Sequence, residues 1–216
     1  AVNVYINKST LTDFSNSGTI KSEGNRGIVI NILGGSSIET FKNSGTIEGK
    51  FRILRVSGAI IKTLINEGTM QGSTNRYPTI DLQGGTIETM INTGTIKGDF
   101  GMSVVGGGKF GKLIMQDGAV VHGNRNGINI DKNQTLGDLE ISGANTKISG
   151  GESGIILHPG ATTQKITIKD GARIEGKTFY GISVRDNANL SGDILISGQG
   201  SMIIGRNAGI GNNNGK

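Results

Sequence analysis

The nine residues Phe41-Lys42-Asn43-Ser44-Gly45-Thr46-Ile47-Glu48-Gly49 join two short apolar patterns through a glycine turn. Related stretches begin at Phe14, Leu64 and Met90 and read FSNSGTIK, LINEGTMQG and MINTGTIKG. A single copy is too short to bury an apolar face by itself, so such copies must stack on one another. The stretch therefore indicates a repeat protein.

The glycine of this turn recurs along the whole chain at intervals of 23 to 28 residues. The successive positions are Gly18, Gly45, Gly68, Gly94, Gly118, Gly143, Gly171 and Gly198. Each repeat also has an apolar residue two positions before a second glycine, as in Ile47 and Gly49, and a short alternating strand, as in Ile80-Asp81-Leu82. Three strands and three turns describe one coil of a β-solenoid. We predict an all-β, right-handed parallel β-helix of about eight coils, three strands per coil, about 40 Å long.

Alternation within the strands predicts which side chains face the interior. Residues two apart share a face, and equivalent residues of adjacent coils stack about 4.8 Å apart. One interior column should contain Ile20, Ile47, Met70, Ile96, Val121, Ile148, Ile174 and Ile203. A second should contain Phe14, Phe41, Leu64, Met90 and Ile114.

Four asparagines occupy equivalent turn positions, Asn16, Asn43, Asn66 and Asn92. Their amides could bond from coil to coil, as in cross-β stacks, with Gln116 as a further member. Asparagine also suits turns as an isolated residue, so both interpretations stay open. The neighbouring structural turn glycines are Gly18, Gly45, Gly68 and Gly94. Gly45, Gly68 and Gly94 should adopt backbone angles that are costly for other residues, so valine at any of these three should destabilise more than Ser44→Val.

The composition restricts the classes of function. With 38 glycines and 2 prolines but regularly placed β-branched residues, the chain is neither a linker nor a helical solenoid. It has no cysteine, and its 22 basic and 17 acidic residues are scattered without runs, so no nucleic-acid partner is expected. No stretch is apolar enough to span a membrane as a helix, so no membrane insertion is expected.

Catalytic and metal-binding patterns are missing from the sequence. Six aspartates, Asp81, Asp99, Asp117, Asp131, Asp170 and Asp186, lie on separate coils, and Asp81 should belong to a polar surface row with Ser103 and Asn129. A glycosidase needs two carboxyls within about 5 to 9 Å. His122 and His158 would approach only on the same side of adjacent coils. We therefore expect no enzyme activity, no cofactor and no metal site, and keep a polysaccharide-degrading enzyme as an alternative.

The pattern F-x-N-S-G-T-I-x-G, at Phe14–Lys21 and Phe41–Gly49, resembles passenger domains of Gram-negative autotransporters, especially vacuolating-cytotoxin-like ones. The resemblance extends over nearly the whole chain. It implies a β-helical passenger at the bacterial cell surface or secreted, exported across the outer membrane. The implied roles are a virulence-associated rigid stalk or adhesin that contacts a host-cell receptor or glycan, or an oligomer-forming toxin or surface-layer module.

The repeats change from N-[STE]-G-T-[IM] to looser forms after Gly118, but no linker separates the two halves. We treat residues 1–216 as a single β-helical segment of a larger passenger domain. Val2, Val4 and Ile6 alternate at the start, and Gly209-Ile210 ends the last coil without a visible cap. An uncapped stack exposes apolar columns, so self-association through the coil ends is expected.

Overall fold

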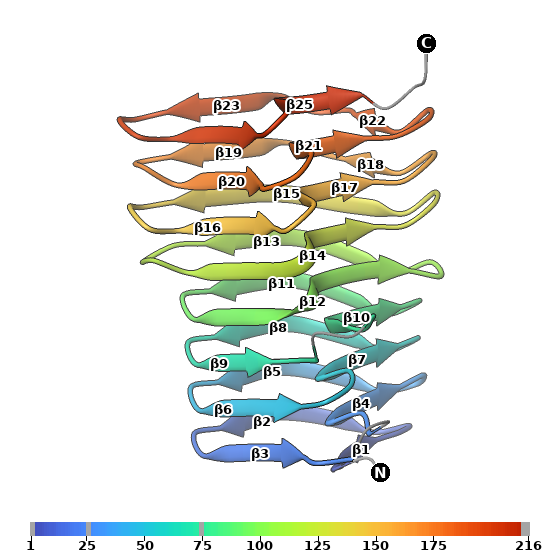
Figure 1. Cartoon of the computed structure of the whole chain (residues 1–216). Coiled ribbons are helices and arrows are strands. Elements are labelled where there is room, and N and C mark those ends of the chain that lie inside the picture. Colours follow the sequence, from blue (N-terminus) through green and yellow to red (C-terminus); the bar gives the residue numbers. More distant parts are fainter. Residues whose placement is uncertain (1–2, 25–26, 74–75, 213–216) are drawn as a thin grey trace.

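A computed structural model describes residues 3–24, 27–73 and 76–212, and it confirms the parallel β-helix (Figure 1). Val2 and Asn75 lie outside this part. About eight coils rise from the N-terminus in a right-handed sense, and the strands of each coil pair in parallel with those of the coils above and below. The described residues include no helix.

The strands form three faces. Face 1 contains β1 (Val4–Ile6), β4 (Ile30–Leu33), β7 (Leu54–Ser57), β10 (Pro78–Gln83), the second halves of β12 (Thr95–Val105) and β14 (Val120–Ile130), β17 (Ser153–Leu157), β21 (Tyr180–Val184) and β25 (Ala208–Asn212). Face 2 contains β2 (Thr10–Asn16), β5 (Ser37–Asn43), β8 (Ile60–Asn66), β11 (Thr86–Asn92), β13 (Lys109–Met115), β15 (Thr135–Ser142), β18 (Thr162–Thr163), β19 (Ile166–Lys169), β22 (Asn189–Leu190) and β23 (Ile194–Ser197). Face 3 contains β3 (Thr19–Ser22), β6 (Thr46–Gly49), β9 (Thr69–Gln71), the first halves of β12 and β14, β16 (Lys147–Gly150), β20 (Arg173–Gly176) and β24 (Met202–Gly205).

Faces 1 and 3 belong to one sheet because β12 and β14 run around the corner between them. The register of these two strands shifts between Gly98 and Phe100, which bends the sheet at that corner. We call it the 3/1 corner. Face 2 is a separate sheet that closes the coil on the opposite side (Figure 1).

One interior column runs the full height of face 3. The paired residues are Ile20, Ile47, Met70, Ile96, Val121, Ile148, Ile174 and Ile203, as the alternation predicts. The six from Ile47 to Ile174 are fully buried, whereas Ile20 and Ile203 at the two ends are only partly covered. Burying an aliphatic side chain of this size contributes about 1.5 to 3 kcal/mol, so the column is a main source of stability.

The second column required a correction. Phe14, Phe41, Leu64 and Met90 stack as predicted, but the next member is Leu113 and not Ile114, which is only partly buried. The prediction placed each column residue four positions before the turn glycine, which gives Ile114 when counted from Gly118. Two residues, Thr93 and Gly94, connect β11 to β12, whereas the four residues 116–119 connect β13 to β14, so Gly118 does not occupy the position of Gly94.

Candidate functional site

The four asparagines form a buried ladder along the edge of face 2. Asn16 donates its amide Nδ2–H to Oδ1 of Asn43 at 2.8 Å, Asn43 donates to Asn66 at 2.9 Å, and Asn66 donates to Asn92 at 2.7 Å. Each amide also donates to the carbonyl of the glycine two residues ahead, at 3.2 to 3.3 Å. The structure therefore favours the ladder over isolated turn residues, and the ladder holds the narrow turns closed.

The ladder ends at Asn92, so the expected extension to Gln116 was wrong. Asn92 pairs with Met115, and Gln116 lies exposed in the wider turn that follows. From that turn onward, Asp117, Gly118, Gly143 and Gly171 adopt positive φ angles. The two sequence patterns of the repeats thus correspond to two turn types, a narrow one closed by asparagine and a wide one that uses the left-handed region.

Asn66→Ala is expected to cost about 1 to 3 kcal/mol of unfolding free energy, because it leaves the Asn43 amide and the Asn92 carbonyl without their buried partners. Asn16→Ala is the matched control. Asn16 lies at the end of the ladder, is 7% exposed, and has Asn43 as its one ladder neighbour. Urea unfolding of both variants measures the difference. Equal losses would contradict a cooperative ladder.

The turn glycines are required for a reason other than the predicted one. Gly18, Gly45, Gly68 and Gly94 are not among the glycines with positive φ. Instead, a Cβ on Gly45, Gly68 or Gly94 would overlap with the carbonyl oxygen of the turn glycine one coil below. At Gly18 a Cβ would meet nothing within 4 Å. The constraint comes from coil stacking.

The outer side of face 1 carries the polar row Asp81, Ser103 and Asn129, in the predicted register. It is not a surface row, however, because Asp81 is 3% and Ser103 is 5% exposed. Asn129 donates to Oγ of Ser103 at 3.2 Å and contacts Nε2 of His158 through Oδ1 at 3.0 Å. This row is a packed hydrogen-bonded network.

The side chains that cover Asp81 were missed by the sequence analysis. Arg52 forms an ion pair and a hydrogen bond with Asp81, and its guanidinium lies 4.8 Å from the Phe51 ring centroid and 4.9 Å from that of Tyr77. Phe51 and Tyr77 contact each other at 3.9 Å between centroids. Burial raises the pKa of the Asp81 carboxyl, against the opposing effect of Arg52 and then Arg55. These residues come from loops of unequal length, which no repeat landmark covers.

The remaining candidates for acid–base chemistry are Asp99 and the two histidines, and the histidines lie on different faces. Asp99, 5% exposed, accepts a hydrogen bond from the Arg76 amide at 2.8 Å at the 3/1 corner. His122 lies on face 3, where Nδ1 contacts Oγ of Ser149 at 2.9 Å, whereas His158 follows β17 on face 1. Within the described ranges, no three His, Asp or Glu side chains are grouped to hold a metal ion.

Both histidines should make the fold less stable in acid. Burial is the largest cause of the lowered pKa of His122, followed by Lys147 and Lys97. Burial also lowers the pKa of His158, with Arg185 next and Asp131 opposing. The folded state then binds fewer protons than the unfolded state, so stability falls as pH drops below the unfolded histidine pKa of about 6.5.

We therefore expect the urea midpoint to be lower at pH 5 than at pH 7.5, and the difference to shrink in the double variant His122→Gln/His158→Gln. Glutamine keeps a polar partner for Ser149 and Asn129 but does not titrate. An unchanged pH dependence in the double variant would show that other groups cause it.

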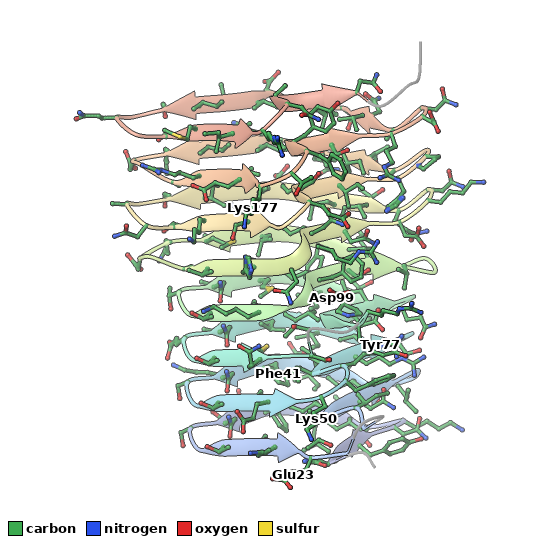
Figure 2. All side chains as sticks on the ribbon, viewed as in Figure 1. Glu23, Phe41, Lys50, Tyr77, Asp99 and Lys177 are labelled. Carbon is green, nitrogen blue, oxygen red and sulfur yellow. The ribbon has the colours of Figure 1, made fainter. Side chains whose placement is uncertain are left out.

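The balance of charge on face 3 differs between its two halves, and the more basic upper half is the candidate binding surface. In coils one to three, Lys21 pairs with Glu48 at 3.1 Å and with Glu23 at 3.6 Å, so opposite charges balance. From β12 upward, cations outnumber carboxylates at the outward positions of face 3 and in the residues just after its strands. The cations are Lys97, Lys147, Arg173, Lys177 and Arg206. We call these five residues the basic face. Figure 2 shows Lys177 and Lys50 at different heights along the helix axis.

A shallow hollow of about 540 Å³ lies within the basic face. Its polar lining consists of His122, Lys147, Ser149, Lys177 and Arg206, with Glu175 as its one carboxylate. Glycine backbone from three coils and the 48% exposed side chain of Ile204 complete it. The hollow thus combines hydrogen-bonding groups, positive charge and a small apolar surface.

None of the described residues belongs to a helix with the length and apolar character needed to cross a membrane. The comparisons with known proteins identified no relative: no protein-family model, no curated protein and no solved structure matches this chain.

Proposed function

We propose that this chain is a non-enzymatic passenger segment of autotransporter type, exported across the outer membrane of a Gram-negative bacterium, that acts as a rigid stalk with an adhesive side. The observation that carries the proposal is the uninterrupted parallel pairing of successive coils on all three faces. Such a stack holds its outward side chains at fixed spacings over its whole length, which suits display and contact. The repeat pattern shared with β-helical passengers supports the cellular location.

The buried carboxylates of Asp81 and Asp99 are each bound to another group of the protein, which supports a non-enzymatic role. Asp81 is paired with Arg52, and Asp99 binds the Arg76 amide. A glycosidase needs a pair of carboxyls that face a common sugar at about 5 to 9 Å. Release of reducing ends from neutral or acidic polysaccharides by the purified chain would overturn this part of the proposal.

Two measurements test location and adhesion. Antibodies against the folded chain should label intact cells of the producing bacterium, and external protease should remove the label. Beads coated with the chain should adhere to host epithelial cells, whereas beads coated with heat-unfolded chain should not. A chain found only inside intact bacteria would contradict the surface location. Surface labelling without bead adhesion would restrict the role to that of a stalk.

A second candidate function is ordered self-assembly through the coil ends, because the last turn is apolar. Two inward apolar side chains of the last coil, Ile196 and Ile210, are 49% and 41% exposed, although their partners Ile168 and Ile182 one coil below are fully buried. At the other end, Phe14 and Ile20 are only partly covered. Because Ile20 and Ile203 are the first and last members of the face 3 column, a second copy stacked end to end would continue that column.

End-to-end association should appear as a concentration-dependent increase in mass by size-exclusion chromatography with light scattering. Val4→Glu or Ile210→Glu should weaken it, because a carboxylate would enter the contact between apolar ends. Lys132→Gln changes the net charge equally at an exposed mid-chain turn and should leave association unchanged. A monomeric chain at all concentrations would exclude this assembly.

A further inference from the structure

We propose that the basic face binds an anionic polysaccharide, one whose sugars carry sulfate or carboxylate groups. This inference rests on the proposed adhesive function and specifies its ligand. Coil stacking gathers cations that are far apart in the sequence. Lys147 and Arg173 are register partners on adjacent coils. Lys97, His122 and Ser149 are register partners on three successive coils and form one outward row.

The positive charge of this surface is largely unopposed. Its neighbouring carboxylates are Glu175, which lines the hollow 3.9 Å from Arg173, Glu152, which is paired with Arg125 at 3.3 Å, and the buried Asp99, which is bound to the Arg76 amide. Lys97, Lys177 and Arg206 are exposed. From Lys97 to the coil of Met202, four steps of about 4.8 Å give a charged track of about 19 Å. A polyanion can therefore contact several cations at once.

The hollow provides contacts for a sugar ring as well as for its charge. Ile204 offers an apolar surface to the C–H side of a ring, and the glycine backbone of β16 and β20 lets a ring approach closely. Ser149 and His122 supply hydroxyl and imidazole groups for hydrogen bonds. The lowered pKa of His122 keeps this imidazole neutral near pH 7, so it can donate or accept.

The chemistry of the lining favours a polysaccharide over a single-stranded nucleic acid. Binding of single strands relies on aromatic side chains that stack on the bases. The residues lining the hollow include no Phe, Tyr or Trp. The lower half of face 3, with its balanced charges and the outward threonines Thr46 and Thr69, offers no comparable attraction.

Heparin serves as the probe, and its affinity is measured by biolayer interferometry at two salt concentrations. The triple variant Lys97→Gln/Lys147→Gln/Lys177→Gln should bind heparin at least about tenfold more weakly, with a smaller salt dependence, because exposed charges are screened by salt. The control Lys50→Gln/Lys109→Gln/Lys132→Gln removes three exposed lysines elsewhere and should bind as the unmodified chain does. Circular dichroism verifies that both variants fold.

Equal losses in the two triple variants would overturn the inference, because binding would then follow net charge alone. Equal binding of uncharged dextran, or stronger binding of single-stranded or duplex DNA at matched charge, would also overturn it. Cell adhesion of coated beads that soluble heparin does not inhibit would refute the ligand and leave the adhesive function standing. Heparin binding by the basic face without adhesion to any cell would support the surface and refute the adhesive function.

Discussion

Replacing Ile96 with aspartate is expected to unfold the central coils. Ile96 is fully buried in the face 3 column between Met70 and Val121, and the replacement places a carboxylate among apolar side chains with no charged partner. Burial of an unpaired charge is among the few single changes that exceed about 4 kcal/mol. In a solenoid each coil contacts only its neighbours, so the damage separates the coils below from those above.

The matched control is Lys97→Asp, which introduces the same side chain at the next, exposed position. It should change stability by no more than about 0.5 kcal/mol. Circular dichroism and urea unfolding measure the two variants, and hydrogen exchange shows which coils lose protection. Comparable losses at both positions would mean that the inward and outward positions of β12 are assigned wrongly.

Replacing Gly68 with alanine should cost about 3 kcal/mol, although alanine adds only one methyl group. Its Cβ would overlap with the carbonyl oxygen of Gly45, which accepts a hydrogen bond from the Thr69 amide at 2.9 Å. The Gly68 amide itself donates to the Asn43 carbonyl at 3.0 Å. Relief of the overlap must separate the coils and weaken both bonds, next to the buried asparagine ladder.

Gly18→Ala is the informative comparison because Gly18 occupies the same turn on the first coil, where nothing lies within 4 Å of the added Cβ. It should be tolerated within about 0.5 kcal/mol. If strained backbone angles were the cause, as the sequence suggested, both alanines would destabilise equally. Thermal unfolding of the two variants therefore separates stacking from backbone strain. The same argument predicts that Gly68→Val destabilises more than Ser44→Val, since Ser44 is exposed.

The asparagine ladder covers the coils in which the repeat pattern predicts the register correctly. In coils one to four the turn is always two residues long, so the spacing from glycine placed Asn16 and Asn92 in the correct register. From coil five the turn widens, and the same count placed Ile114 in the column where Leu113 belongs. A side chain changes face with every one-residue shift, so one unrecognised insertion reverses inside and outside.

The sequence by itself determined the class of fold, the number of coils and most of the interior columns. These properties depend on the alternation of apolar and polar residues and on turn residues within about 25 residues of chain, and every copy of the repeat contains the same pattern. Only the tertiary structure decided which outward side chains share a surface. Arg52 meets Asp81, and Lys147 lies beside Arg173, because stacking brings residues of successive coils within about 5 Å, however far apart they are in the chain. Loops of unequal length hide that register from the sequence, so charges that look scattered gather on one face.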